Sequence, residues 1–328
     1  MKQVLIEKYG TPWDVARCAD VPDVGAPAAD EVVFDVLAFP INPADIWFCR
    51  GSYRLKPPLP ATPGAECVGR VTAVGASVKH VKPGDLVINL QRENWAQKRK
   101  VKGDDAIPLP AGIDLRQAAM VRINPPTAQL MLSDFVDLKG GDWVIQNVAN
   151  SGVGNYVMQL AKQRGLRTVN LVRRESAVAA TKEQGGDIVL VDGERLADRV
   201  KEATGGAAIR LGIDAVGGAA TDRLAQCLSE GGTLVNYGMM GGEPCQVAPS
   251  SLIFRDITLR GFWLAKWFRD TSLDARRTLY GELTQLVASG ALHARIHATY
   301  PVDRIQEAVA AANEGERDGK ILVTGGAV

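Results

Sequence analysis

The feature that most constrains the fold is an apolar run that ends in small residues and passes directly into an amphipathic helix. It is the stretch VIQNVANSGVGNYVMQLAK, residues 144–162. The first part is typical of a β-strand, and the second has the apolar spacing of a helix. Small residues between them let a ligand approach the backbone, while the free N–H groups and the helix dipole favour an anion such as a phosphate. The alternative is a tight strand-to-helix turn whose small residues serve packing alone.

Strands alternate with helical segments from about Asn124 onwards. The strands are rich in β-branched residues, as in WVIQNV (143–148), RTVNLVRR (167–174) and DIVLVD (187–192), and further strands are expected over 208–218, 231–240 and 257–265. This alternation predicts an α/β fold with a six-stranded, doubly wound parallel sheet that carries helices on both faces. The first 120 residues or so are instead rich in strands and turns, which predicts a separate β-rich part.

Composition narrows the class of protein. The 328 residues are 46% hydrophobic and 23% charged, with a net charge of +1, so no global field favours nucleic acid or an anionic membrane surface. No stretch approaches the roughly 18 apolar residues of a membrane span, and the apolar run from Val4 to Ile6 is shorter than we expect for the h-region of a signal peptide. The five cysteines are scattered and never form a C-x-x-C pair. A reduced, cytoplasmic setting is therefore expected.

The residue types that bind metals are scarce. The chain has three histidines, His80, His293 and His297, and none lies near a cysteine at ligand spacing. His293 and His297 are four residues apart, but HARIH lacks the glutamate of a zincin helix. We expect these histidines to be surface or packing residues and the protein to hold no metal.

The residues at the end of the predicted strand 167–174 indicate which coenzyme could bind. The A-x-S-x-x-G spacing that ends at Gly154 is a degenerate dinucleotide fingerprint, weak by itself. An NAD enzyme usually places Asp or Glu at the end of the next strand, to bind the ribose 2′-hydroxyl. This chain has Arg173 and Arg174 there, and a guanidinium pair matches a 2′-phosphate. NADPH is therefore predicted, against the alternative of a solvated basic turn and with Glu175 as a counter-signal.

Several segments, taken together, resemble one family over nearly the whole chain. They are FPINPADIWFCRGSY (39–53), PGAECVGRVTAVG (63–75), VIQNVANSGVG (144–154), LRTVNLVRR (166–174), LIFRDITLRGFWLAKW (252–267) and the closing GKILV. The chain resembles the medium-chain dehydrogenase/reductase superfamily, and within it the zinc-free 2-enoyl thioester reductases. QNVANSGVG together with RGFWL is the most specific part of this likeness. Ala65 stands where the zinc alcohol dehydrogenases carry a histidine ligand, and NPAD stands where they carry a cysteine ligand. Residues 90–101, LQRENWAQKRKV, depart from the glycine-rich pattern expected there.

The resemblance implies a reaction. Hydride would pass from NADPH to the β-carbon of an α,β-unsaturated thioester, linked to CoA or to an acyl-carrier protein. The resulting enolate must be stabilised at oxygen and protonated at the α-carbon. Tyr53 matches the family's tyrosine and is the predicted catalytic residue, against the alternative of a loop tyrosine that only packs.

The resemblance also implies the cofactor contacts, carried over position by position. The predicted cofactor-binding residues are Asn124 near the nicotinamide or its ribose, Asn150, Ser151, Gly152 and Val153 at the pyrophosphate, Arg173 and Arg174 at the 2′-phosphate, Tyr237, Gly238, Met239, Met240, Phe262, Trp263 and Leu264 on the nicotinamide side, and Lys320.

The resemblance implies a subunit of two domains that assembles into a homodimer. Residues 1–123 and 266–328 would form a split, partly open, GroES-like β-barrel that acts as the catalytic domain, and residues 124–265 a Rossmann domain that binds NADPH. A homodimer through edge strands near 231–240 and 257–265 is expected. Two rival functions stay open: a zinc-free NADPH quinone oxidoreductase or enone reductase, and a non-catalytic NADPH-binding protein.

Overall fold

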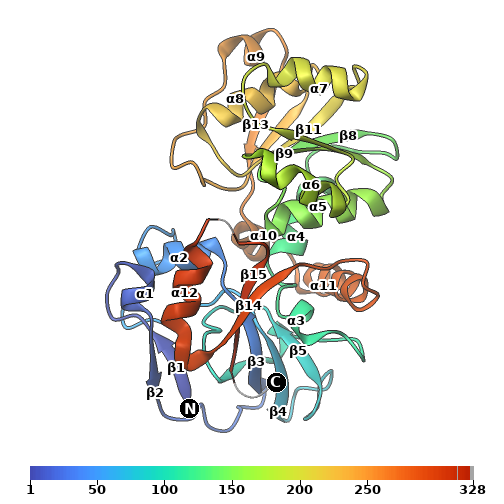
Figure 1. Ribbon diagram of the computed structural model, residues 1–328. Helices are drawn as coiled ribbons and strands as arrows, with labels where there is room; N and C mark the ends of the chain where they lie inside the picture. Colours follow the sequence, from blue (N-terminus) through green and yellow to red (C-terminus); the bar gives the residue numbers. More distant parts are fainter. Residues whose placement is uncertain (316, 326–328) are drawn as a thin grey trace. The chain divides into compact units, whose positions relative to one another are not determined.

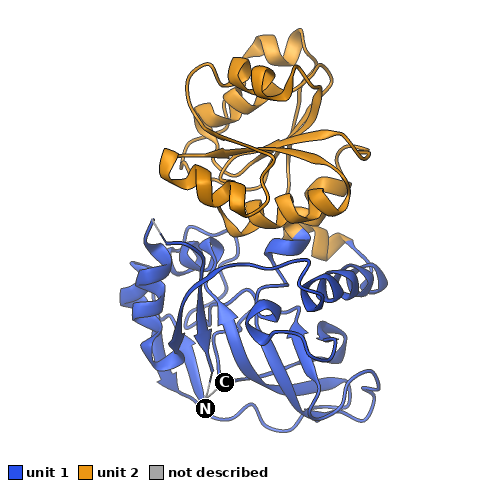
Figure 2. Cartoon of the chain, turned by 45° about the vertical axis from the view of Figure 1, so that its right-hand side comes forward, with its two compact units in different colours: residues 1–126, 271–328 blue, residues 127–270 orange. Residues whose placement is uncertain are grey.

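The computed structural model describes residues 1–315 and 317–325, and the chain divides into two compact units (Figures 1 and 2). Unit 1 comprises Met1–Pro126 and Thr271–Val328, and unit 2 comprises Thr127–Asp270. Unit 1 is thus assembled from both the N-terminal and the C-terminal parts of the sequence, while unit 2 is continuous. Among the described residues, no helix combines the length and the apolar character needed to cross a membrane.

Unit 2 is built on six parallel strands in the order β10-β9-β8-β11-β12-β13. The strands are β8 (Trp143–Gln146), β9 (Arg167–Val172), β10 (Ile188–Val191), β11 (Ile209–Asp214), β12 (Thr233–Asn236) and β13 (Thr258–Gly261). The helices are α5 (Gly152–Gln163), α6 (Val178–Glu183), α7 (Leu196–Thr204), α8 (Gly218–Cys227), α9 (Pro249–Ile253) and α10 (Leu264–Asp270), and α4 (Asn124–Ser133) leads into the unit. Helices α5 and α6 lie on one side of the sheet, and α7 and α8 lie on the other (Figure 1).

This arrangement confirms the predicted doubly wound parallel sheet. The chain runs outward from β8 through β9 to β10, then crosses back to β11 and continues outward the other way. The order of the strands therefore reverses between β8 and β11, and ligands of such sheets bind at the carboxyl ends of the strands at that point. Because both faces are covered, the central strands are almost wholly buried, and residues such as Ile145, Val169 and Leu234 pack in one core.

Three strands, β11, β12 and β13, end clearly earlier than the sequence predicts. The strand expected over 231–240 ends at Asn236, whose side chain donates to the carbonyl of Gly238 at 3.0 Å. Gly238 approaches Ala215 so closely that a Cβ at this position would lie 2.8 Å from the carbonyl oxygen of Ala215. The strand expected over 257–265 ends at Gly261, and the carbonyl of Trp263 already accepts the N–H group of Lys266 at 2.9 Å in the first turn of α10. Local helix hydrogen bonding replaces strand pairing at that point.

Unit 1 holds a seven-stranded sheet in the order β14-β15-β3-β4-β5-β7, with β6 also paired to β3. The sheet strands are β3 (Glu31–Pro40), β4 (Val68–Val74), β5 (Leu86–Asn89), β6 (Lys98–Lys102), β7 (Ala106–Pro108), β14 (Ile296–Pro301) and β15 (Lys320–Thr324), beside a separate pair, β1 (Lys2–Leu5) and β2 (Arg17–Asp20). The helices of this unit are α1 (Pro12–Val15), α2 (Pro43–Arg50), α3 (Leu115–Ala118), α11 (Leu273–Ala288) and α12 (Ile305–Asn313). The C-terminal strand β15 pairs antiparallel with β3, so the end of the chain completes a sheet that the N-terminal part begins.

The sheet of unit 1 curves around an apolar core, as expected of a partly open barrel. Strand β3 pairs with β15, β4 and β6, and its register with β4 shifts at two places, which bends the strand. Phe34, Phe39 and Trp95 are fully buried, and the rings of Phe39 and Trp95 stack with centroids 5.9 Å apart. Large aromatic side chains of this kind contribute much of the burial that holds a small barrel together.

Candidate functional site

The first turn of α5 begins at the carboxyl end of β8. Ser151 caps the helix, and its side-chain oxygen accepts the N–H group of Gly154 at 3.1 Å. A Cβ at Gly154 would lie 2.5 Å from the carbonyl oxygen of Ala149, so only glycine lets the helix start this close to the strand. The N–H groups of Gly152 and Val153 belong to the first turn, where a helix supplies no acceptor of its own. Together with the helix dipole, these donors suit a phosphate group.

A strained residue supports this turn. Val148 has a φ of 51°, in the left-handed region that β-branched residues avoid. Hydrogen bonds fix its neighbours: the N–H group of Asn147 donates to Ile213 at 3.1 Å, and that of Ala149 donates to Leu171 at 3.0 Å. The carbonyl of Val148 in turn accepts the N–H group of Ser151 at 2.9 Å. Such strain persists only where the surroundings hold it, and it concentrates at ligand sites.

The predicted arginine pair follows the adjacent strand. Strand β9 pairs with β8 and ends at Val172, so Arg173 and Arg174 lie on the same edge of the sheet as the first turn of α5. Arg173 is exposed and Arg174 is half-buried, and exposed Glu175 begins the short helical turn that follows. Guanidinium groups at this edge suit a 2′-phosphate.

A buried aspartate connects the carboxyl ends of three central strands. Asp214, at the end of β11, is fully buried. Its side chain accepts hydrogen bonds from Asn147 at 2.6 Å, from Thr221 at 2.7 Å and from Asn236 at 3.0 Å. The N–H group of Val216 donates to the same carboxylate at 2.9 Å. These hydrogen bonds hold the carboxyl ends of β8, β11 and β12 together beside the first turn of α5.

The residues after β12 form a turn beside α5. Burial raises the pKa of Tyr237 above its usual range, and a hydrogen bond with the Ser151 side chain opposes that rise. The structure therefore brings two of the predicted residues, Tyr237 and Ser151, into contact. Gly238 follows at the close approach already described, and the side chains of Met239 and Met240 are 54% and 55% exposed.

The residues after β13 connect the sheet to α10. The ring of Phe262 meets the ring of Phe135 edge-on, with centroids 6.1 Å apart. Trp263 is half-buried, and Leu264, the first residue of α10, is buried. Phe262, Trp263 and Leu264 thus lie at the carboxyl edge of the sheet that also carries the first turn of α5.

In unit 1, helix α2 fixes the place of Tyr53. A capping box joins Asn42 and Asp45 at the start of the helix, and Gly51 ends it with a φ of 72°. The N–H group of Tyr53 then donates to the carbonyl of Trp47 at 3.2 Å, and the half-buried ring packs against the core of the unit. Tyr53 is therefore held just beyond the C-terminal end of α2.

Buried polar side chains gather beside this helix. We call them the buried cluster, and its members are Asn42, Asp45, Glu66, Arg122 and Lys320. Asn42 is its central member: its amide nitrogen donates to Glu66 at 2.7 Å, and its amide oxygen accepts a hydrogen bond from the Lys320 ammonium group. The N–H group of Ile123 donates to the other oxygen of Glu66 at 2.9 Å. The cluster was missed in the sequence, although a glutamate inside the apolar run of PGAECVGRV was a signal.

The electrostatics of the cluster follow from its burial. Burial raises the pKa of Glu66 to about 7, and the charge of Lys320 and the hydrogen bond from Asn42 oppose this. Burial lowers the pKa of Lys320 to about 8, and the charge of Glu66 opposes that change. Burial also raises the pKa of Asp45, against the charge of Arg92. At neutral pH the cluster can therefore gain or lose a proton at Glu66 or Lys320.

These features can be tested for their fit to NADPH. The first turn of α5 and the two arginines supply donors for phosphate groups. Asn124, another predicted residue, is 6% exposed, and its amide nitrogen has no acceptor within the described part of the chain. A buried donor left without an acceptor is costly, and a bound carbonyl or hydroxyl group would satisfy it. Lys320 is 9% exposed and hydrogen-bonded to Asn42. The residues present fit a dinucleotide with a 2′-phosphate.

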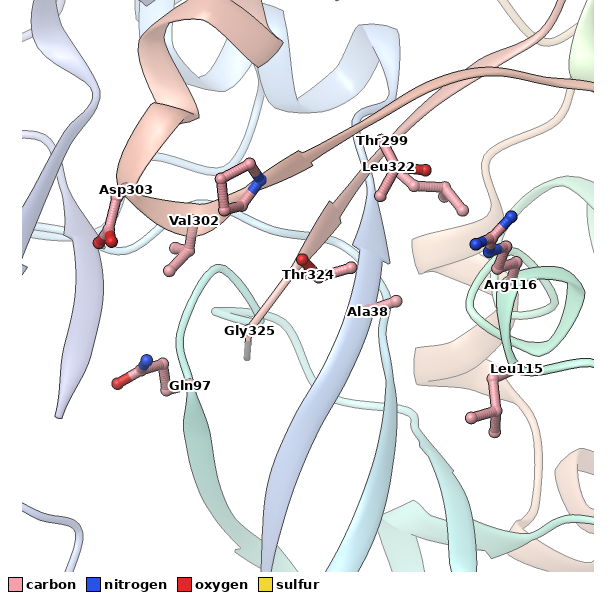
Figure 3. Close-up of a pocket in the computed structure, with 11 residues that line it drawn as sticks. Ala38, Gln97, Leu115, Arg116, Thr299, Val302, Asp303, Leu322, Thr324 and Gly325 are labelled. Atoms are coloured by element: carbon pink, nitrogen blue, oxygen red, sulfur yellow. The ribbon is translucent and has the colours of Figure 1, made fainter. Parts of the chain in front are cut away.

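A cavity of about 470 Å³ lies elsewhere in unit 1 (Figure 3). Its lining comes from β3, β14 and β15, from α3 and from neighbouring loops, and includes Arg116, Thr299 and Thr324. None of the residues predicted for the site lines it. We therefore assign it no part in the reaction.

Ligands for a metal ion do not converge in the parts of the chain that the structure describes. Across residues 1–315 and 317–325, no three His, Cys, Asp or Glu side chains are grouped so as to hold a metal ion. The Nε2 atom of His80 lies 3.0 Å from the carbonyl oxygen of Gly103, as in a packing residue.

Two domain families match the chain. Residues 28–110 match the alcohol dehydrogenase GroES-like domain, and residues 152–279 match the zinc-binding dehydrogenase family. Among curated proteins, the mitochondrial enoyl-[acyl-carrier-protein] reductase of Caenorhabditis elegans is 38% identical, over 88% of this chain and 85% of its own length. The human enzyme of the same name is 36% identical, over 96% of this chain and 87% of its own length.

Two solved structures resemble this chain over nearly its whole length. The complex of Etr1p with NADP and crotonyl-CoA has a TM-score of 0.88 and 27% identity, and the match covers 98% of this chain and 99% of that one. A Bacillus thuringiensis protein described as an NADPH:quinone reductase has a TM-score of 0.90 and 28% identity, with 98% of each chain covered.

One expectation is overturned by these comparisons. The relatives from Caenorhabditis elegans, rat, human and Arabidopsis thaliana are all named mitochondrial enzymes. The predicted cytoplasmic location is therefore wrong. Scattered cysteines indicate a reducing compartment, and that property does not distinguish one such compartment from another.

Proposed function

This chain belongs to the 2-enoyl thioester reductases of the medium-chain dehydrogenase/reductase family, and we propose that it reduces 2-enoyl thioesters by hydride transfer to the β-carbon without a metal ion. It is an NADPH-dependent oxidoreductase that acts on C=C bonds. The observation that carries this proposal is the likeness, over 98% of the chain, to a reductase structure that holds NADP and crotonyl-CoA. The acyl group would be linked to CoA or to an acyl-carrier protein.

The residues of unit 2 would bind the cofactor. NADPH, when bound, supplies the hydride. The N–H groups of Gly152 and Val153 in the first turn of α5 would bind the pyrophosphate, beside Asn150 and Ser151 just before the helix. Arg173 and Arg174 would bind the 2′-phosphate. The turn from Tyr237 to Met240, of which Met239 and Met240 are exposed, and the segment from Phe262 to Leu264 would flank the nicotinamide.

Two residues of unit 1 would complete the cofactor contacts. The amide nitrogen of Asn124 would donate to the nicotinamide or its ribose, which would give this buried group its missing acceptor. Lys320 would contribute positive charge toward the cofactor while it remains bonded to Asn42.

Tyr53 would handle the charge that develops on the substrate. Hydride addition at the β-carbon leaves an enolate, whose oxygen needs a hydrogen-bond donor and whose α-carbon needs a proton. The phenol hydroxyl of Tyr53 would supply one or both. Its half-buried position just beyond the end of α2 supports this role, because the ring packs against the core of the unit while the residue is not fully buried.

The experiment that tests this function measures NADPH oxidation with crotonyl-CoA. We expect turnover by the wild type, and a loss of roughly 10²–10⁴-fold in kcat for Tyr53→Phe with unchanged NADPH affinity. Tyr9→Phe is the matched control. The Tyr9 hydroxyl makes a long hydrogen bond of 3.4 Å to the carbonyl of Pro57 and has no role in the proposal. A Tyr53→Phe enzyme with the wild-type rate would remove Tyr53 from the mechanism.

A second function is favoured by one observation, the likeness to a protein described as an NADPH:quinone reductase. The same assay with a quinone and with a free enone separates the two functions. Turnover of the quinone at a higher kcat/KM than crotonyl-CoA would replace the first proposal with the second.

The assembly proposed for this protein is a homodimer that forms through β13. This strand is the edge of the sheet of unit 2, and Leu259 on it is 38% exposed. Ile253 and Phe254, just before the strand, are 71% and 77% exposed. An edge strand with apolar neighbours is well suited to pair with a second copy. Sedimentation should show a dimer that Leu259→Asp with Phe254→Glu converts to a monomer, and a monomeric wild type would contradict the proposal.

A further inference from the structure

Arg92 lies in the loop between β5 and β6 and contacts side chains from both ends of the α2 segment. Its guanidinium carbon is 5.3 Å from the centroid of the Tyr53 ring. Its Nη2 atom is 3.9 Å from the carboxylate of Asp45. Asp45 stands in the first turn of α2, whereas Tyr53 lies just after the helix ends. One cation therefore links the buried start of the helix to the tyrosine beyond its end.

The loop that carries Arg92 is fixed by its own hydrogen bonds. The side chain of Asn89 donates to that of Asn94 at 2.6 Å, and Asn94 donates to the carbonyl of Gln91 at 2.7 Å. Arg99 donates to the carbonyl of Arg92 itself at 3.1 Å. The next residue, Glu93, has a φ of 68°, a left-handed conformation that is unfavourable for a residue with a side chain. The hydrogen bonds of the loop hold this strained backbone conformation, in which the Arg92 side chain contacts the ring of Tyr53.

The contacts of Arg92 have a clear electrostatic reason. Asp45 is fully buried, and a buried carboxylate needs a nearby cation. Burial raises the pKa of Asp45, and the charge of Arg92 is the largest influence that opposes the rise, ahead of Lys320. The Arg92 side chain is 25% exposed, so its attraction to the ring of Tyr53 is only partly screened by water. A planar guanidinium can contact a carboxylate and an aromatic ring at the same time.

We propose that Arg92 is a positioning residue for Tyr53: anchored by Asp45, its guanidinium group holds the phenol ring in the orientation from which the hydroxyl reaches the substrate. This inference rests on the proposed function, in which Tyr53 serves the enolate. It assigns a role to residues 90–101, whose sequence departs from the glycine-rich pattern expected there.

The test begins with the charge of Arg92. Arg92→Met keeps an unbranched apolar side chain in place of the arginine's aliphatic stem and removes the charged guanidinium group. We expect kcat with crotonyl-CoA to fall by about 3- to 30-fold, with NADPH affinity unchanged. Arg92→Lys keeps a cation and should recover part of that loss. Arg50→Met is the matched control, because Arg50 is an exposed arginine of α2 that bonds to Asn313 and does not contact the ring of Tyr53. An Arg92→Met enzyme with the kcat of the wild type would overturn the proposal.

Two further variants separate positioning from a merely structural role. Arg92→Met leaves the Asp45 carboxylate buried without its cation, which by itself could disturb the fold. Arg92→Met with Asp45→Asn removes both charges, so a structural cause predicts recovery of kcat, whereas positioning predicts that the loss remains. In a Tyr53→Phe background, Arg92→Met should have no further effect on kcat, because the hydroxyl that it positions is gone. Additive losses would show that Arg92 acts independently of Tyr53, against the proposal.

A spectroscopic measurement keeps the inference independent of the reaction. Tyrosine labelled with ¹³C at Cζ gives one resonance per residue, and Tyr53→Phe identifies the resonance of Tyr53. We expect this resonance to move in Arg92→Met and to stay in place in Arg50→Met. If the wild type fails to reduce crotonyl-CoA, the proposed function fails, and the resonance still decides whether Arg92 positions the ring. An unmoved resonance in Arg92→Met would overturn the positioning role.

Discussion

Glu66 provides the sharpest test of the electrostatics of unit 1. Its carboxyl group is fully buried, and burial raises its pKa from 4.5 to about 7. Between these two values the native protein binds a proton that the unfolded chain releases, so stability falls as the pH rises through this window. The pKa difference corresponds to about 3 kcal/mol in the free energy of unfolding. Below about pH 4.5 the contribution of the protonated carboxyl is complete, and above about pH 7 it is lost.

Replacing Glu66 with Gln removes this dependence. The free energy of unfolding of the wild type, relative to that of Glu66→Gln, should fall by about 3 kcal/mol between pH 4.5 and pH 7.5. Lys320 adds to the effect in the same direction. The charge of Glu66 holds the pKa of Lys320 up, so its removal lowers that pKa further and lets the variant gain stability as the pH rises.

The assay is urea unfolding at half-unit steps of pH, followed by tryptophan fluorescence. Measurements stop at pH 7.5, below the pKa of about 8 for Lys320, so that the deprotonation of this lysine in the wild type contributes little. Glu7→Gln, at an exposed position of the same unit, controls for the chemistry of the substitution. A difference between the wild type and Glu66→Gln that stays constant with pH would refute the reasoning, because it would mean that Glu66 titrates alike in the native and unfolded states.

Three further predictions concern the cofactor and the metal. Arg173→Ala with Arg174→Ala should abolish a preference for NADPH over NADH of roughly tenfold or more and leave NADH affinity nearly unchanged, as measured by calorimetry; equal wild-type affinities for the two coenzymes would contradict this. Gly154→Ala places a Cβ 2.5 Å from the carbonyl oxygen of Ala149, so it should lower the free energy of unfolding by about 1–3 kcal/mol, and with it the melting temperature, and should weaken NADPH binding. An unchanged melting curve would contradict this, because it would show that the turn can relax. With Ala65 where the zinc enzymes have a ligand, activity should survive a strong chelator, and restoration of lost activity by zinc would count against metal-free chemistry.

The sheet of unit 2 could be predicted because its signals are local. Each strand is a short β-branched run, each helix carries its own apolar stripe, and the turn before α5 is legible as small residues between the two. The arginines after β9 could be found for the same reason, since their position depends only on where one strand ends. The ends of β12 and β13 were predicted too late because a close backbone approach, such as that of Gly238 to Ala215, is set by a different strand.

The strained and ionic features could not be found in this way. The sequence around Val148 and Glu93 does not predict a positive φ at these residues, because the neighbouring strands and loops impose it. Arg92 is one of several charged residues in its segment, and only the fold reveals that it faces Asp45 and Tyr53. Such contacts join residues whose separation along the chain carries no periodic signal.

The buried cluster is an extreme case of this limit, and its charge balance has a consequence for mutation. Asp45 and Glu66 are buried carboxyl groups, and Arg92, Arg122 and Lys320 supply the cations around them. Arg92 is not a member of the buried cluster, but it belongs with the cluster to unit 1, the unit that holds Tyr53. Because each buried charge is stabilised by the others, the loss of one leaves its partner without compensation and costs more than the loss of a pair. Paired neutral substitutions should therefore be better tolerated than single ones throughout this cluster, which is the behaviour of an ionic network whose members act together.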